Sequence, residues 1–473
     1  MLKLFLKLDN LIWFLAIVIL IAIPLMQKFP FLGVPGTFVS IRVEDLLLFL
    51  SFVIVVFRVS QKFFEYIDNR IIKFFVVFSG IGLVSYLCAL MITQTVIPHI
   101  GFLHWARRIE YFVPFILGYE FFRTKDIQGR LNLVINCILV VIVFAFVYGF
   151  GQRYFSWPII ITQNEEYSKG VALKWVEGSH INSTFAGHYD LSTYLVLILS
   201  IIIALFFLFQ KSYSKAILGV AWILGMWLLV NAASRISFLS YLVSSVFVLI
   251  LLKKFKAIVF LLTFSILFAS MSSNLLARYQ RIIEVTLTEY LSVNSLLTVH
   301  ASIKETDVLP ETARQKTLTI TPTPIPVFED RSTNIRLDVE WPRAIRAFNK
   351  NPLLGTGYSS LGLATDNTYL RALGEVGILG FFSFLGLLGS IWFVFLKVVR
   401  FKKLIPEINL TQNLTIAKGF LAGVIGAQVG ILINGVFIDV FEASKFAITF
   451  WLFSGFAVGL ISFGIKKDKN VSV

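Results

Sequence analysis

The segment ATDNTYLRALGEVGILG, residues 364–380, places five polar side chains at the start of an apolar stretch. They are Asp366, Asn367, Tyr369, Arg371 and Glu375. A carboxylate can accept a proton, an amide or a phenol can hydrogen-bond a hydroxyl group, and a guanidinium can pair with an anion. Because ionisable groups are costly beside an apolar helix, this grouping indicates a functional site.

A second candidate segment, IRLDVEWPRAIRAFNKNP, precedes it at residues 335–352. We expect this segment to be helical and to end before Pro352, because proline disfavours a helical conformation of the residue before it. Pro342 either kinks the helix or starts a second one after Trp341, since proline is well tolerated in the first helical turn.

Three arginines, Arg336, Arg343 and Arg346, lie within this segment. Residues seven apart share a face of a continuous helix, as do residues three apart. A guanidinium matches the geometry of phosphate oxygens and stays charged near a membrane, so these side chains could clamp a pyrophosphate without a metal ion. The alternative is that they form salt bridges with Asp338, Glu340 or lipid headgroups.

A further arginine, Arg235, lies in the segment NAASRISF, which has almost no other charged or strongly polar character. A charge kept at the mouth of an apolar helix is more often functional than structural. We therefore include Arg235 among the candidate anion-binding residues.

The segment GSHINSTFAGHYDLSTY, residues 178–194, concentrates hydrogen-bonding side chains before another apolar stretch. His180 and His188 are its candidate binding residues, with Asn367 and Tyr369 of the opening segment, for contacts to sugar hydroxyls or to neighbouring loops. The spacing of eight between the histidines matches no compact metal-ligand motif, so no metal site is predicted.

The glycine-rich run NPLLGTGYSSLG, residues 351–362, permits tight turns and a close approach of backbone N–H groups to an anionic ligand. Glycines serve ordinary turns just as well, so the run alone decides nothing. The sequence contains no Gly-x-Ser-x-Gly, Walker or His-Glu-x-x-His motif. No cofactor is predicted.

The composition is that of an integral membrane protein: 57% of the 473 residues are hydrophobic and 15% are charged, against about 25% charged in soluble domains. The apolar residues form blocks of the length that crosses a bilayer as a helix. Most basic residues of the +15 net charge lie in short clusters between these blocks. This pattern orients helices in a membrane and argues against nucleic-acid binding.

The sequence predicts an all-α membrane protein with about 12 transmembrane helices. Their expected ranges are 11–27, 44–58, 71–92, 108–122, 130–150, 189–210, 214–232, 235–252, 256–273, 374–397, 414–435 and 440–464. Because basic residues favour the cytoplasmic side, clusters such as those at 58–73 and 397–403 place both termini in the cytoplasm.

This topology divides the chain into three parts. Residues 1–273 form helices 1–9, with an external loop near 151–188. Residues 274–373 form a large external loop between helices 9 and 10, which carries the candidate motifs and a disordered Thr/Pro-rich insertion near 302–330. Residues 374–473 form helices 10–12 and a short basic cytoplasmic tail.

The order of these features resembles the O-antigen ligase and O-antigen polymerase family. The matching features are an acidic start of the second helix (IRVEDLLLFL), STFAGHYDLSTYL, ASRIS, the Arg336 to Trp341 stretch, NPLLGTGYSSL and DNTYLRALGEVGILG. The resemblance spans most of the chain in topology, and the specific matches fall within residues 180–240 and 330–395.

The resemblance implies an inverting, metal-independent glycosyltransferase that moves a glycan from a polyprenyl-pyrophosphate carrier to an acceptor at the outer face of the cytoplasmic membrane. The acceptor could be a glycan, a lipid-linked core or a protein. Arg235 and Arg336 match the family's donor-binding arginines. The family's motif usually reads His-Asn-x-Tyr-Leu, with the histidine as the proposed base, whereas Asp366 stands at that position here.

A carboxylate can replace histidine as a proton acceptor, so Asp366 is the candidate base and Glu375 the alternative one. Asp366 could instead cap the following helix or pair with Arg371. At the level of function, a polymerase of the same family, a transporter or flippase of lipid-linked or anionic solutes, and a scaffold subunit remain open.

Overall fold

The computed structural model describes residues 8–27, 30–33, 40–124, 126–160, 174–272, 280, 334–362, 364–400 and 412–465. The predicted Thr/Pro-rich insertion near 302–330 and the basic tail after residue 465 lie outside these ranges. Of the predicted large loop, residues 280, 334–362 and 364–373 are described.

The described elements are helical except for one short antiparallel hairpin, β1 (Pro30–Gly33) and β2 (Ser40–Arg42). The first helices are α2 (Leu8–Leu25), α3 (Val43–Gln61), α4 (Phe63–Asp68), α5 (Arg70–Cys88), the π-helix η1 (Ala89–Thr93), α6 (Pro98–Phe121) and α7 (Ile127–Tyr154). They are followed by α9 (His188–Leu208), α10 (Ser212–Asn231), α11 (Arg235–Leu251) and α12 (Phe255–Ser270). The last are the π-helix η2 (Ile335–Glu340), α15 (Trp341–Lys350), α16 (Thr368–Arg400), α17 (Gln412–Asn434), α18 (Ser444–Gly459) and the π-helix η3 (Leu460–Ile465).

The all-α prediction is confirmed, with the β hairpin as an addition that the sequence analysis missed. Among the described residues, eight helices are long and apolar enough to cross a membrane: α2, α5 with η1, α7, α9, α10, α16, α17 and α18 with η3. Two further apolar helices, α11 and α12, are shorter. The count of 12 spans stays a prediction.

One helix start differs from the sequence-based expectation in a way that matters for charge. α6 begins at Pro98, ten residues before the expected range, because proline fits the first turn of a helix. Arg107 and Arg108 therefore lie inside α6 rather than before it. Arg108 is accommodated there by an ion pair with Glu442, which follows α17.

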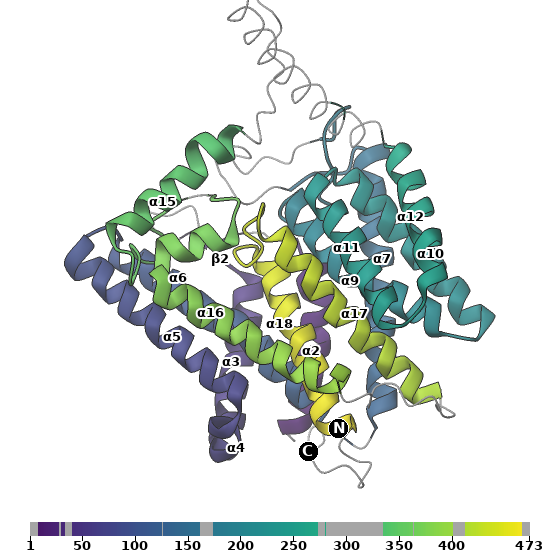
Figure 1. Ribbon diagram of the computed structural model, residues 1–473, viewed down its shortest axis with the longest axis horizontal. Helices are drawn as coiled ribbons and strands as arrows, with labels where there is room; N and C mark the ends of the chain where they lie inside the picture. Colours follow the sequence, from purple (N-terminus) through teal and green to yellow (C-terminus); the bar gives the residue numbers. More distant parts are fainter. Residues whose placement is uncertain are drawn as a thin grey trace, which may run out of the picture.

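The helices pack in pairs that are distant in sequence: α6 lies along α18, α9 along α17, and α5 along α16. Of the eight candidate spans, α9, α17 and α18 are the most buried and form the centre of the bundle. Figure 1 shows α15 at one end of the molecule, together with the start of α16, and α4 at the opposite end.

The helix α16 is broken at Gly377, whose φ of 64° and ψ of −169° are not helical. The turn at residues 352–357 fills this break with backbone hydrogen bonds. Ile378 N–H donates to Pro352 O at 2.9 Å, and Gly357 N–H donates to Glu375 O at 2.8 Å. A Cβ atom on Gly355 would lie 2.4 Å from the carbonyl carbon of Glu375, so only glycine allows this approach.

Candidate active site

Arg336, in η2, reaches groups on two other parts of the chain. Its Nε and Nη2 both donate to Oδ2 of Asp366, at 3.0 and 2.7 Å. Nη2 also donates to the hydroxyl of Tyr189, in the first turn of α9, at 3.2 Å. Only 8% of Arg336 is exposed, so this charge is buried and paired. The structure thus joins the predicted donor-binding arginine to the predicted carboxylate base.

Asp366 lies in a turn that Asp439, between α17 and α18, holds in place. The Asp439 carboxylate accepts the N–H of Thr365 at 2.8 Å and of Asn367 at 3.1 Å. Asp366 itself has a φ of 48°, which is uncommon for a residue other than glycine. The surrounding hydrogen bonds stabilise this conformation, which directs the Asp366 carboxylate toward η2.

Asn367 and Tyr369 make contacts within the protein. Oδ1 of Asn367 caps α16 by accepting the N–H groups of Tyr369 at 3.0 Å and Leu370 at 2.9 Å. The Tyr369 hydroxyl donates to the carbonyl of Leu432, in α17, at 2.6 Å. The residue that caps α16 is therefore Asn367, and not Asp366, for which this role was considered above.

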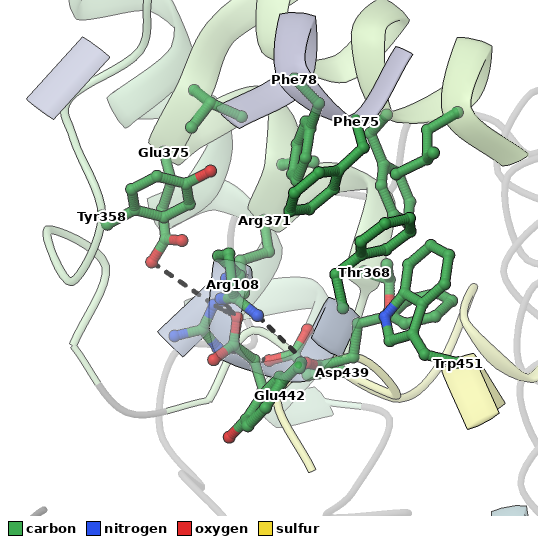
Figure 2. A pocket seen from close by; sticks show the side chains of 17 residues that line it. Phe75, Phe78, Arg108, Tyr358, Thr368, Arg371, Glu375, Asp439, Glu442 and Trp451 are labelled. Carbon is green, nitrogen blue, oxygen red and sulfur yellow. Dashed lines mark hydrogen bonds and ion pairs between the residues drawn. The ribbon is translucent and has the colours of Figure 1, made fainter. Parts of the chain in front are cut away.

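A second charged network surrounds Arg371, one turn into α16 (Figure 2). Its side chain pairs with three carboxylates, at 2.7 Å from Asp439, 3.3 Å from Glu442 and 3.4 Å from Glu375. Arg108 of α6 also pairs with Glu442. Two arginines thus meet three carboxylates, and Asp439 connects this network to the turn that carries Asp366.

Glu375, the alternative base, is 3% exposed and belongs to this second network. It lines a cavity between α5, α6, α16 and α18, together with Tyr358 (Figure 2). The apolar side of the cavity is formed by aromatic side chains that include Phe75, Phe78, Phe112, Phe384 and Trp451. Glu375 is therefore placed in a separate ion-pair network from Arg336.

His180 and His188 come together, with ring centroids 3.6 Å apart. The ring of His188 also lies 4.0 Å from that of Tyr189, whose hydroxyl contacts Arg336. The predicted binding segment before α9 therefore adjoins the arginine site. Within the described ranges, no three His, Cys, Asp or Glu side chains are arranged to hold a metal ion.

Arg235 is the first residue of α11, half-buried, and follows the N-cap Ser234. A buried polar chain fixes this helix against its neighbours. The Ser237 hydroxyl donates to Asn434 Oδ1 of α17 at 3.2 Å, and Asn434 Nδ2 donates to the Thr193 hydroxyl of α9 at 2.7 Å.

The segment that carries the other arginines is helical, as predicted, with the change of helix type at Trp341 and Pro342. Nη2 of Arg343 donates to the carbonyl of Ala364, beside the Asp366 turn. Arg346 is exposed on α15. Of the two arginines on α15, Arg343 is thus the one in contact with the site.

Four adjacent groups at this site have buried polar atoms without a hydrogen-bond partner among the described residues. They are Glu340 Oε2, Trp341 Nε1, Arg343 Nε and Thr365 Oγ1. Leaving such a group unsatisfied costs about 1–3 kcal/mol. Both donors and acceptors are present, which is the pattern expected where a polar ligand completes the bonding.

The two carboxyl groups beside Arg336 titrate differently from free carboxyls. Burial raises the pKa of Asp366 above its ordinary value, while Arg336 acts in the opposite direction. Burial, and then the charge of Asp366, raise the pKa of Glu340 to about 7, against the opposing effect of Arg336.

Sequence reasoning missed Asp439 and treated Glu340 only as a salt-bridge partner. Asp439 had a readable signal, because it is an acidic residue within the apolar run GVFIDVF. Glu340 had none, because a glutamate near arginines on a helix is most simply explained as an ion pair.

Comparison with models of known protein families shows which family this part of the chain resembles. Residues 220–385 match the family model described as O-antigen ligase. This part of the chain is similar to O-antigen ligases. The resemblance noted from the motifs is thereby confirmed, and the matched residues include Arg235, Arg336, Asp366 and Glu375. No curated protein matches the chain. This similarity, together with the bundle of apolar helices, indicates a membrane enzyme that acts on glycans.

Proposed function

We propose that this protein transfers a glycan from a polyprenyl-pyrophosphate carrier to an acceptor hydroxyl at the outer face of the cytoplasmic membrane. The observation that carries the proposal is the buried Arg336, held by Asp366 at one end of the helix bundle, within the matched residues. The acceptor is a growing glycan, a lipid-linked core or a protein.

Arg336 provides the charge for the donor. In the free protein its counter-ion is Asp366, on which two N–H donors converge. A pyrophosphate carries more negative charge and more acceptor oxygens than one carboxylate, so it can replace Asp366 as the counter-ion of Arg336. Arg343, whose Nε is buried without a described partner, is the second candidate contact. Arginine charge stabilises the leaving polyprenyl pyrophosphate without requiring a metal ion.

The acceptor hydroxyl must lose a proton as it attacks the sugar carbon attached to the pyrophosphate. A carboxylate of the Arg336 site is suited to accept this proton. Asp366, at the position of the family's histidine, is the carboxylate that the sequence favours.

The arrangement of the bundle supports the proposed orientation. Basic residues flank α4 in the sequence. They include Arg58, Lys62, Arg70 and Lys73. Such clusters favour the cytoplasmic side. The site at α15 lies at the opposite end (Figure 1), which supports the proposal that it faces the outer side.

The proposal is tested with purified protein in liposomes that contain a labelled polyprenyl-pyrophosphate oligosaccharide and a glycolipid acceptor, in the presence of a chelator. We expect labelled glycan on the acceptor and an equal amount of released polyprenyl pyrophosphate. A donor that crosses the bilayer with its glycan still attached, and no transfer to any acceptor tried, would instead support a transporter.

A further inference from the structure

Two carboxylates lie at the Arg336 site, and their surroundings differ. Asp366 accepts two N–H groups of Arg336 on one oxygen, at 3.0 and 2.7 Å. Glu340 is four residues after Arg336, at the end of η2, and its Oε2 is buried without a partner among the described residues. Glu340 is therefore the carboxylate with a buried oxygen that no described residue hydrogen-bonds.

The neighbours of Glu340 indicate what kind of ligand would fit. Trp341 Nε1 and Thr365 Oγ1 are also buried and lack a described partner. The Trp341 ring lies 6.1 Å from the partly exposed ring of Phe437. Aromatic faces beside a few hydrogen-bonding groups are suited to a sugar ring, whose C–H face packs on the aromatics while its hydroxyls bond to the polar atoms.

We propose that Glu340 is the base that accepts the proton of the acceptor hydroxyl, and that Asp366 positions Arg336 for the donor. This inference rests on the proposed glycosyl transfer. It assigns the acceptor sugar to the side chains of Glu340, Trp341, Thr365 and Phe437.

The reaction step balances with these groups. An electron pair of the acceptor oxygen forms the bond to the anomeric carbon of the donor. The bond from that carbon to the pyrophosphate oxygen breaks, and its electron pair leaves with the polyprenyl pyrophosphate. The hydroxyl proton moves to the Glu340 carboxylate and is later released to water.

The titration of Glu340 is consistent with this role. Burial, with the nearby charge of Asp366, raises the pKa of Glu340 to about 7. A base works best when its pKa lies near the working pH, because it is then deprotonated and still holds a proton well. Below that pH the Glu340 carboxylate is protonated and can no longer accept the hydroxyl proton. The transfer rate should therefore fall as the pH is lowered through about 7.

The test compares Glu340→Gln and Glu340→Asp with Asp366→Asn in the liposome assay, from pH 5 to 9. We expect Glu340→Gln to lower kcat by about 10²- to 10⁴-fold with the donor KM retained. It should also abolish the rise in rate near pH 7, whereas Glu340→Asp keeps part of both. Asp366→Asn should mainly change the donor KM. Thermal unfolding of each variant verifies that it is folded.

The outcomes separate the two proposals. If the wild-type protein transfers glycan and Glu340→Gln keeps its rate and pH profile, Glu340 is not the base but the proposed function stands. If only Asp366→Asn loses kcat and the pH-dependent rise in rate, the base is Asp366 and not Glu340. If the wild-type protein transfers no glycan, the proposed function fails, and the assignment of Glu340 fails with it.

Discussion

At the scale of single residues, the acidic side chains around the start of α16 have distinct environments. Asp366 is a counter-ion of Arg336, whereas Asp439 and Glu442 balance the buried Arg371. The sequence analysis selected Arg336 and Asp366 separately, because each stood out as a charge near an apolar segment, but it did not predict their contact. Asp439 is 73 residues after Asp366 in the chain, and only the packing of the helices shows that its carboxylate holds the same turn.

A residue-scale prediction concerns Asp439→Asn. The amide lacks the charge that pairs with Arg371, and its NH₂ group cannot accept, so one of the two N–H bonds from Thr365 and Asn367 is lost. Breaking a buried ion pair costs about 3–5 kcal/mol, so we expect a clear fall in the Tm of the purified protein. The control is Asp68→Asn, which removes the charge from an exposed ion pair with Lys73 and should change the Tm little. Equal Tm values for Asp439→Asn and wild type would refute this role.

At the scale of elements, the site depends on the interruption of α16. The turn at 352–357 enters the break, and the Ser85 hydroxyl of α5 donates to the carbonyls of Leu354 at 2.5 Å and Glu375 at 3.0 Å. The sequence analysis recognised the glycine-rich run and left open an anion-binding role. The structure shows that the N–H of Gly357 is used by Glu375 O. Hydropathy predicts an uninterrupted helix here, because it does not register a break that tertiary contacts fill.

The element-scale prediction is that Gly377→Ala destabilises the protein and disturbs the site. Its φ of 64° and ψ of −169° cost a residue with a side chain about 1–3 kcal/mol. The added Cβ would also lie 2.4 Å from Leu353 O. The measurement is thermal unfolding of the two variants Gly377→Ala and Gly389→Ala.

Gly389 is the matched control, because it lies in the same helix with no atom within 4 Å of an added Cβ. Alanine there should be neutral or stabilising, since it favours helix over glycine by about 1 kcal/mol. If both variants unfold at the same temperature as the wild type, the break at Gly377 has no structural importance.

At the scale of the whole molecule, the sequence predicts more of the fold than of the site. Long apolar runs predict helices directly, because a bilayer requires internal backbone hydrogen bonding. They do not predict which helices pair, such as α6 with α18 or α5 with α16. Apolar runs also misplace the start of a helix that contains charged residues, as in α6 with Arg107 and Arg108. Such charges are stabilised by partners from distant segments.

The whole-molecule prediction is that α15 and α4 face opposite sides of the membrane. We would introduce Asn349→Cys or Asp68→Cys, both at exposed positions, in a chain whose Cys88 and Cys137 are replaced. A membrane-impermeant maleimide should label Asn349→Cys in intact cells, and Asp68→Cys only after permeabilisation. Labelling of Asp68→Cys alone in intact cells would invert the proposed topology.

The most direct test of the account is the initial rate of glycan transfer by Arg336→Ala, relative to the wild type, in the chelator-containing liposome assay. Loss of one preorganised donor to a developing negative charge lowers rates by about 10²- to 10³-fold, and we expect a fall of that size. The control, Lys350→Ala, removes an exposed cation at the end of α15, the helix that follows η2, and should change the rate by less than about twofold. Transfer by a folded Arg336→Ala protein at the wild-type rate would contradict the account.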